Sequence, residues 1–128
     1  MGTIREIVFE SGHPATLARF WAATLDGYEI RPYDDDEIAR LGALGLTPET
    51  DPTVMVDGPG PSLCFQRVAE RRYENNRIHL DIAVADCETE VARLCAIGAS
   101  VLRKQTDYTV LRDPEGNQFC VVAARRLG

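Results

Sequence analysis

The order of elements in residues 77–124 constrains the fold most, because the first half of the chain can be read in the same order. Residues 77–84 alternate apolar and polar side chains as a strand does, and residues 87–97 carry apolar side chains at helical spacing. Further strands are expected after that helix, at 100–104, 108–112 and 118–123. The first half predicts the same succession of strand, helix and three strands, at 4–10, 14–25, 28–33, 53–57 and 62–68. The sequence therefore predicts two βαβββ units, about 1–69 and 77–124.

One segment of the first half, residues 34–52, has no counterpart in the second. From Glu6 on the first opening strand to Gln66 on the last strand of that unit is 60 residues. From His79 to Cys120, the corresponding pair in the second unit, is 41 residues. The difference of 19 is the length of the segment, which we therefore interpret as an insertion in the first unit.

The inserted segment is predicted to contain a short helix at 38–44. The acidic run at 34–37 suits a helix start, because the helix dipole favours negative charge there. The apolar side chains of this helix need a surface to bury against. The mouth of a cleft and a second subunit are both candidates.

Size, charge and cysteine spacing limit the class of protein. The 128 residues suit a single domain, and a net charge of −6 with a pI of about 4.9 disfavours nucleic acid and anionic membranes as partners. No apolar run approaches the roughly 20 residues of a membrane-spanning helix, and no signal segment is apparent at the N-terminus. The four cysteines show no Cys-x-x-Cys spacing, so we expect reduced thiols and a cytoplasmic protein.

Strand parity predicts a polar face that several strands share. Alternate residues of a strand lie on the same side of a sheet, and the apolar set must pack on the helices. The opposite face is predicted to form a ligand pocket from Glu6, Glu10, Cys64, Gln66, His79, Asp81, Gln118 and Cys120. The alternative is a solvated face, which antiparallel sheets commonly have.

Short motifs in matching elements carry a resemblance to a known family. His79 precedes Asp86 at a strand-to-helix junction, residues 113–117 read Asp-Pro-Glu-Gly-Asn, and residues 75–81 read Asn-Asn-Arg-Ile-His-Leu-Asp. With these motifs the chain resembles the glyoxalase-like domains of the vicinal-oxygen-chelate superfamily, which also includes bleomycin resistance proteins and dioxygenases. The resemblance implies an α+β fold. In it, two βαβββ units form a curved, mostly antiparallel eight-stranded sheet around a cleft, with helices on the outer face.

The resemblance also implies where a divalent metal would bind. Relatives place His, Gln or Glu ligands on the first and last strand of each unit. These positions map to Glu6, Gln66, His79 and Cys120, with Cys64 as an alternative to Gln66 that would reduce the spacing difference to 17. Metal-using relatives carry glutamate where this chain has Cys120. The donor set that results suits zinc better than magnesium, manganese or iron(II).

The chemical roles of the predicted pocket residues remain alternatives. His79 would be a metal ligand, a general base, or a structural histidine bonded to Asp81 or Glu6. Asp81 would orient that imidazole or bind Arg77. Cys120 would be a thiolate nucleophile activated by His79, or a small buried apolar residue, which is the interpretation we favour.

Two classes of function follow from the resemblance. The first is a small-molecule pocket protein that acts as a lyase, isomerase or dioxygenase-type enzyme with an altered or absent metal. The alternative is a non-catalytic protein that sequesters its ligand, as drug-resistance members of the superfamily do. The resemblance implies a homodimer in either case, with a small molecule as the partner and neither nucleic acid nor membrane.

Overall fold

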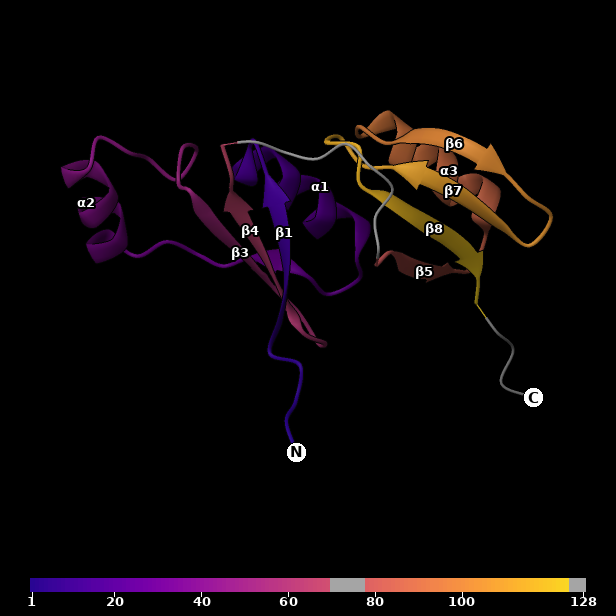
Figure 1. Ribbon diagram of the computed structural model, residues 1–128, viewed down its shortest axis with the longest axis horizontal. Coiled ribbons are helices and arrows are strands. Elements are labelled where there is room, and N and C mark those ends of the chain that lie inside the picture. Colours follow the sequence, from indigo (N-terminus) through magenta and orange to yellow (C-terminus); the bar gives the residue numbers. More distant parts are fainter. Residues whose placement is uncertain (70–77, 125–128) are drawn as a thin grey trace. The chain divides into compact units, whose positions relative to one another are not determined.

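The computed structural model describes residues 1–69 and 78–124, which belong to two compact units. The units are Met1–Arg71 and Arg72–Gly128, and each contains one four-stranded sheet (Figure 1). The eight strands and three helices of the described ranges confirm the predicted α+β fold of two βαβββ units. None of these helices has the length and apolar character that crossing a membrane requires.

The first unit begins and ends with neighbouring strands. Its elements are β1 (Glu6–Ser11), α1 (Pro14–Thr24), β2 (Glu29–Ile30), α2 (Asp35–Ala43), β3 (Thr53–Asp57) and β4 (Ser62–Arg67). The strands lie in the order β1-β4-β3-β2, with β1 and β4 parallel and the other neighbours antiparallel. Side chains from the two ends of the unit therefore lie next to each other on the same face of the sheet.

The core of the first unit lies between its sheet and α1. Pro14 occupies the first turn of α1, where a missing N–H group costs nothing. Trp21 on α1 is only 1% exposed, and its ring lies 5.3 Å from that of Phe9 in β1. The Phe9 ring in turn stacks on Phe65 in β4 at 4.9 Å. The apolar residues of alternate parity thus pack on the helix, as the sequence predicted.

The predicted insertion is confirmed as α2 and its flanking loops, between β2 and β3 (Figure 1). The side chain of Asp34 caps α2 by accepting a hydrogen bond from the backbone N–H of Glu37 at 2.8 Å. Arg19 of α1 donates two hydrogen bonds to the Glu49 carboxylate, at 2.8 and 2.7 Å. This ion pair ties the far end of the inserted segment to α1.

Part of the apolar surface of the insertion stays exposed in the single chain. Leu41 is 1% exposed, whereas Ile38 and Leu44 are 45% and 67% exposed. Ile38 and Leu44 thus remain largely uncovered in the single chain, and their covering by a further surface stays a prediction.

The second unit repeats the arrangement of strands without an insertion. Its elements are β5 (Leu80–Val84), α3 (Cys87–Ala96), β6 (Ser100–Lys104), β7 (Tyr108–Arg112) and β8 (Gln118–Ala123). The order is β5-β8-β7-β6, with β5 and β8 parallel and the other neighbours antiparallel. Asp86 caps the start of α3 by accepting a hydrogen bond from the Thr89 N–H at 3.1 Å, and Leu94 of α3 is fully buried.

Predicted and observed boundaries coincide for β3, β6, β7 and β8, but the second strand is much shorter than predicted. We expected a strand at 28–33, and β2 contains only Glu29–Ile30. The N–H of Arg31 still donates to the Met55 carbonyl at 2.9 Å, but Pro32 has no N–H with which to continue the ladder. The predicted start of the fifth strand at Arg77 and the predicted link over 70–76 lie outside the described residues.

Strand register decides whether Cys64 or Gln66 of the first unit corresponds to Cys120 of the second. Partners in β1 and β4 are 56 positions apart, and partners in β5 and β8 are 39 positions apart. The offsets differ by 17, which is the smaller of the two values considered from the sequence. We keep the match of Glu6 to His79. The counterpart of Cys120 is then Cys64, and not Gln66.

The turn between β7 and β8 is organised by the carboxylate of Asp113. Its Oδ1 accepts hydrogen bonds from the backbone N–H groups of Glu115 and Asn117, both at 2.9 Å, and its Oδ2 accepts one from the Asn117 side chain at 2.7 Å. Asp113 is 3% exposed, and Gly116 adopts a φ of 87°, which side chains disfavour. The turn therefore fixes where β8 begins and how it pairs with β7.

Asp113→Ala is expected to lower the free energy of unfolding by about 1–3 kcal/mol, because the substitution removes the buried acceptor of three partly buried N–H donors. Chemical denaturation followed by far-ultraviolet circular dichroism measures the change. Asp107→Ala, in the exposed turn between β6 and β7, is the matched control and should change stability by less than about 0.5 kcal/mol. Equal losses in the two variants would contradict the role given to Asp113.

Candidate functional site

The parallel pairing of β5 with β8 brings the polar residues of the second unit together. Asp81 lies opposite Cys120 in this register, so the two side chains share one face of the sheet. His79 directly precedes β5 and stands two residues before Asp81, which gives it the same parity. Leu80 and Ile82 of β5 lie on the opposite face of the sheet and pair with apolar residues of β8.

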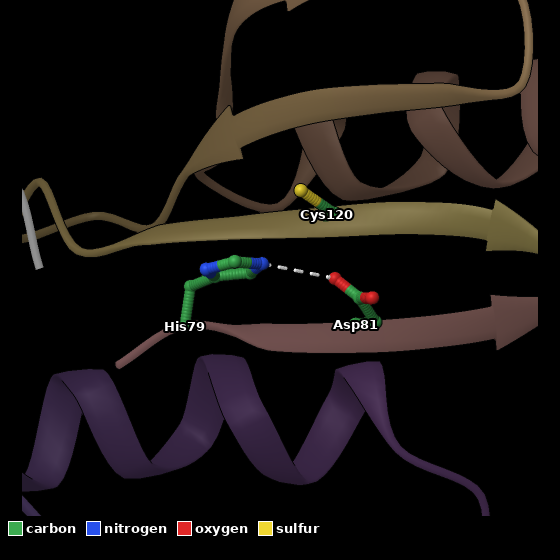
Figure 2. Close-up of side chains that lie close together, drawn as sticks. All are labelled: His79, Asp81 and Cys120. Atoms are coloured by element: carbon green, nitrogen blue, oxygen red, sulfur yellow. Dashed lines mark ion pairs between the residues drawn. The ribbon is translucent and has the colours of Figure 1, made fainter. Parts of the chain in front are cut away.

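His79, Asp81 and Cys120 form a cluster, called here the β5–β8 cluster. The Nε2 atom of His79 lies 3.3 Å from Oδ1 of Asp81, and Figure 2 shows the imidazole and the carboxylate side by side along β5. Cys120 lies on the neighbouring strand, and one donor atom from each of the three residues lies within 4.8 Å of the others. Of the roles considered for Asp81, the structure shows the pairing with His79; Arg77 lies outside the described residues.

The surroundings of Cys120 favour the protonated thiol, whose proton a metal ion would have to displace. Burial raises the pKa of the Cys120 thiol, and the negative charge and the hydrogen bond of Asp81 raise it further. Arg103 acts in the opposite direction but has the smallest effect. A nucleophilic cysteine needs a lowered pKa, so this environment favours a neutral, half-buried thiol over a thiolate.

The β5–β8 cluster opens into a pocket that the second unit forms by itself. The pocket has a volume of about 270 Å³. Its lining residues come from β5, β6, β7 and β8 and the residue before β5: His79, Asp81, Arg103, Tyr108, Val110, Gln118, Phe119, Cys120 and Val122. The structure thus brings together four of the residues that parity singled out, namely His79, Asp81, Gln118 and Cys120.

The other predicted site residues lie on the sheet of the first unit. Glu6 and Glu10 are on β1, and Cys64 and Gln66 are on β4, all with the same parity, and Cys64 is the buried member of the four. Glu6 accepts a hydrogen bond from Arg5 at 3.2 Å. Burial raises the pKa of the Cys64 thiol, and the charge of Glu6 adds to that shift, so Cys64 is also a neutral thiol.

Sequence reasoning missed the pocket residues that come from β6 and β7. Tyr108 and Val110 pair with Val122 and Cys120, and parity across that hairpin would have placed them on the pocket face. Parity could not predict the face to which Arg103 points, because that face depends on an irregularity in the pairing of β6 with β7.

The donor atoms of the β5–β8 cluster fit a borderline metal ion. Zinc is commonly bound by imidazole nitrogen, thiolate sulfur and carboxylate oxygen, and three such ligands leave one position open for a ligand molecule. Magnesium prefers oxygen donors in octahedral geometry, which this set does not provide. His79, Asp81 and Cys120 are therefore the residues of the second unit that would hold zinc.

Comparison with known proteins identifies relatives by sequence profile and by fold. The profile of the family described as glyoxalase-like domain matches residues 6–122. A search of curated proteins finds no significant match.

Several solved structures share the fold over nearly the whole chain. A glyoxalase/bleomycin resistance protein/dioxygenase family enzyme from Burkholderia phytofirmans PsJN is 12% identical, with a TM-score of 0.70, and the alignment covers 97% of this chain and 100% of that one. The fosfomycin resistance protein FosX from Mesorhizobium loti is 10% identical, with a TM-score of 0.65 and coverage of 99% and 94%. A glyoxalase/bleomycin resistance protein/dioxygenase from Nocardioides is 16% identical, with a TM-score of 0.62 and coverage of 100% and 87%.

Asp81→Asn is expected to make Cys120 more reactive. Asp81 raises the pKa of the thiol, so removal of its charge lowers that pKa and increases the thiolate fraction at a given pH. The rate of alkylation of Cys120 by iodoacetamide at pH 8, followed by peptide mass spectrometry, should rise about threefold or more. Asp107→Asn removes the same charge from an exposed turn and should leave the rate unchanged. An unchanged rate in Asp81→Asn would show that the carboxylate does not control the thiol.

Proposed function

The chain belongs to the glyoxalase-like domain family, and we propose that it binds a small organic molecule in the pocket of its second unit, beside a divalent ion held by the β5–β8 cluster. The observation that carries this proposal is the convergence of three different metal-binding side chains at the wall of one pocket. The three donor atoms lie within 4.8 Å of one another, and His79, Asp81 and Cys120 all line the pocket.

The proposed chemistry is of the lyase or isomerase type. A bound zinc ion would supply a Lewis acid that polarises an oxygen atom of the ligand. The residues of the chain bind and orient: Asp81 fixes the ring of His79, and the apolar side chains of Val110 and Val122 limit the water around the bound molecule.

The second candidate function is sequestration of a ligand without turnover. The neutral thiol of Cys120 favours it, because a metal ligand at this position would have to lose its proton. A protein that only holds its ligand needs shape and polar complementarity in the pocket, and neither a nucleophile nor a base.

The proposal also includes the assembly and the compartment of the protein. It is a cytoplasmic homodimer in which residues 1–128 of each subunit form one domain. All four cysteines are free, which agrees with a reducing compartment. The exposed Ile38 and Leu44 of the insertion are apolar surface of the kind that a second subunit would cover. Light scattering coupled to gel filtration tests the dimer, and a mass of 14.2 kDa at all concentrations would contradict it.

Zinc binding tests the role of the β5–β8 cluster. We expect the chain to bind one zinc ion in competition with a chromophoric chelator, and Cys120→Ser to weaken binding by more than about a hundredfold, beyond the roughly 10–100-fold that loss of an outer-shell partner costs. Cys95→Ser is the matched control, since Cys95 is a free, exposed cysteine on α3. Equal zinc affinity in the wild type and in Cys120→Ser would remove Cys120 from the site.

His79→Ala separates the two candidate functions once a ligand is identified from a panel of small carbonyl compounds and antibiotics. The catalytic proposal predicts that turnover and zinc affinity fall together by about a hundredfold or more, because His79 is a proposed ligand of the ion and even loss of an outer-shell partner costs roughly 10–100-fold. A protein that sequesters its ligand would show no turnover in the wild type and weaker binding in the variant.

A further inference from the structure

Arg103 points into the pocket because of a bulge in β6. Val101 pairs with Leu111, but Arg103 pairs with Val110, so one extra residue stands between them in β6. In a regular ladder Arg103 would lie opposite Thr109, whose side chain is buried on the other face of the sheet. Bulges of this kind often re-aim a side chain next to a functional site.

The charge of Arg103 has no partner among the described residues of the chain. Its neighbour Lys104 lies 3.6 Å from Glu88, and Arg93 on α3 donates to Glu90 at 3.0 Å, but no described carboxylate forms an ion pair with Arg103. Its positive charge reaches Cys120, where it opposes the effect of Asp81 on the thiol. Within the described ranges, no carboxylate therefore competes with a ligand for this guanidinium group of the pocket.

The two polar ends of the pocket are separated by an apolar floor. His79 and Asp81 of the cluster lie at the edge formed by β5 and Arg103 lies on the other edge strand, β6, with β8 and β7 between them. At about 4.8 Å between neighbouring strands, the backbones of β5 and β6 are about 14 Å apart. Val110, Val122 and the ring of Tyr108 line the space between. The volume of about 270 Å³ lies just below the usual range for pockets of drug-sized ligands, so the ligand is small.

We propose that this pocket selects a small organic monocarboxylate, whose carboxylate is bound by the fork of Arg103 and whose apolar body lies over β7 and β8. A guanidinium group matches a carboxylate with two parallel hydrogen bonds. The negative charge of Asp81 at the opposite end disfavours a second anionic group on the ligand. The inference rests on the proposed function, since it names the class of ligand for the same pocket.

Titration of the isotope-labelled full chain with four matched probes tests the proposal. The probes are benzoate, the neutral benzamide, the cationic benzylamine and phenylphosphonate, and backbone amide shifts report both the site and the Kd. Benzoate should perturb residues 79–122 and bind at least about tenfold more tightly than benzamide, because a charge-assisted pair is stronger than a neutral one. Arg103→Gln should abolish that difference, and Arg103→Lys should retain part of it.

Arg112→Gln is the matched control. It removes the same charge from β7, but Arg112 does not line the pocket, and the preference for benzoate should persist. The titrations are run with and without added zinc. The comparison distinguishes binding of the benzoate carboxylate to zinc from its binding to Arg103.

The outcomes separate this inference from the proposed function. If no probe perturbs residues 79–122, both proposals fail. If benzamide binds the pocket as well as benzoate does, or if the preference for benzoate appears only with zinc or survives in Arg103→Gln, the pocket stands and the role of Arg103 is wrong. Tighter binding of phenylphosphonate than of benzoate would overturn the assignment of a monocarboxylate.

Discussion

The parallel pairing of the first and last strand in each unit is the constraint on which the rest of the structure depends. In a parallel pair, neighbouring residues point to the same face, so the pairing of β1 with β4 and of β5 with β8 sorts apolar from polar side chains across both strands at once. In the first unit one face buries Phe9 and Phe65 against α1. In the second unit the other face places Asp81 beside Cys120. The site is therefore a consequence of the pairing that builds the core.

Much of this arrangement could be predicted from periodicity. Alternation with a period of two gave the strands, helical spacing gave α1 and α3, and parity placed His79, Asp81, Gln118 and Cys120 on the face where the structure has a pocket. Arg103 could not be found in this way, because a single extra residue in β6 reverses the parity of everything beyond it. Periodicity does not reveal a bulge, which depends on how two strands pair.

The remaining differences have local physical causes. Pro32 shortens β2 because it cannot donate to the ladder. The match of Cys64 rather than Gln66 to Cys120 became decidable only from the hydrogen-bonded register of both units. The sequence also left open whether Cys120 is a thiolate, and its burial next to Asp81 favours the neutral thiol. An environment of this kind depends on three-dimensional packing, which residue spacing alone does not describe.

X-ray absorption at the zinc edge tests the central claim most directly, which is that His79, Asp81 and Cys120 form one site in the second unit. Zinc–sulfur bonds in proteins are about 2.3 Å long, whereas bonds to histidine nitrogen and carboxylate oxygen are about 2.0–2.2 Å. The protein loaded with one equivalent of zinc is predicted to show a single sulfur neighbour at the longer distance, together with nitrogen and oxygen neighbours at the shorter one. A zinc-loaded protein whose spectrum contains only nitrogen and oxygen neighbours, or a chain that retains no zinc, would contradict the account.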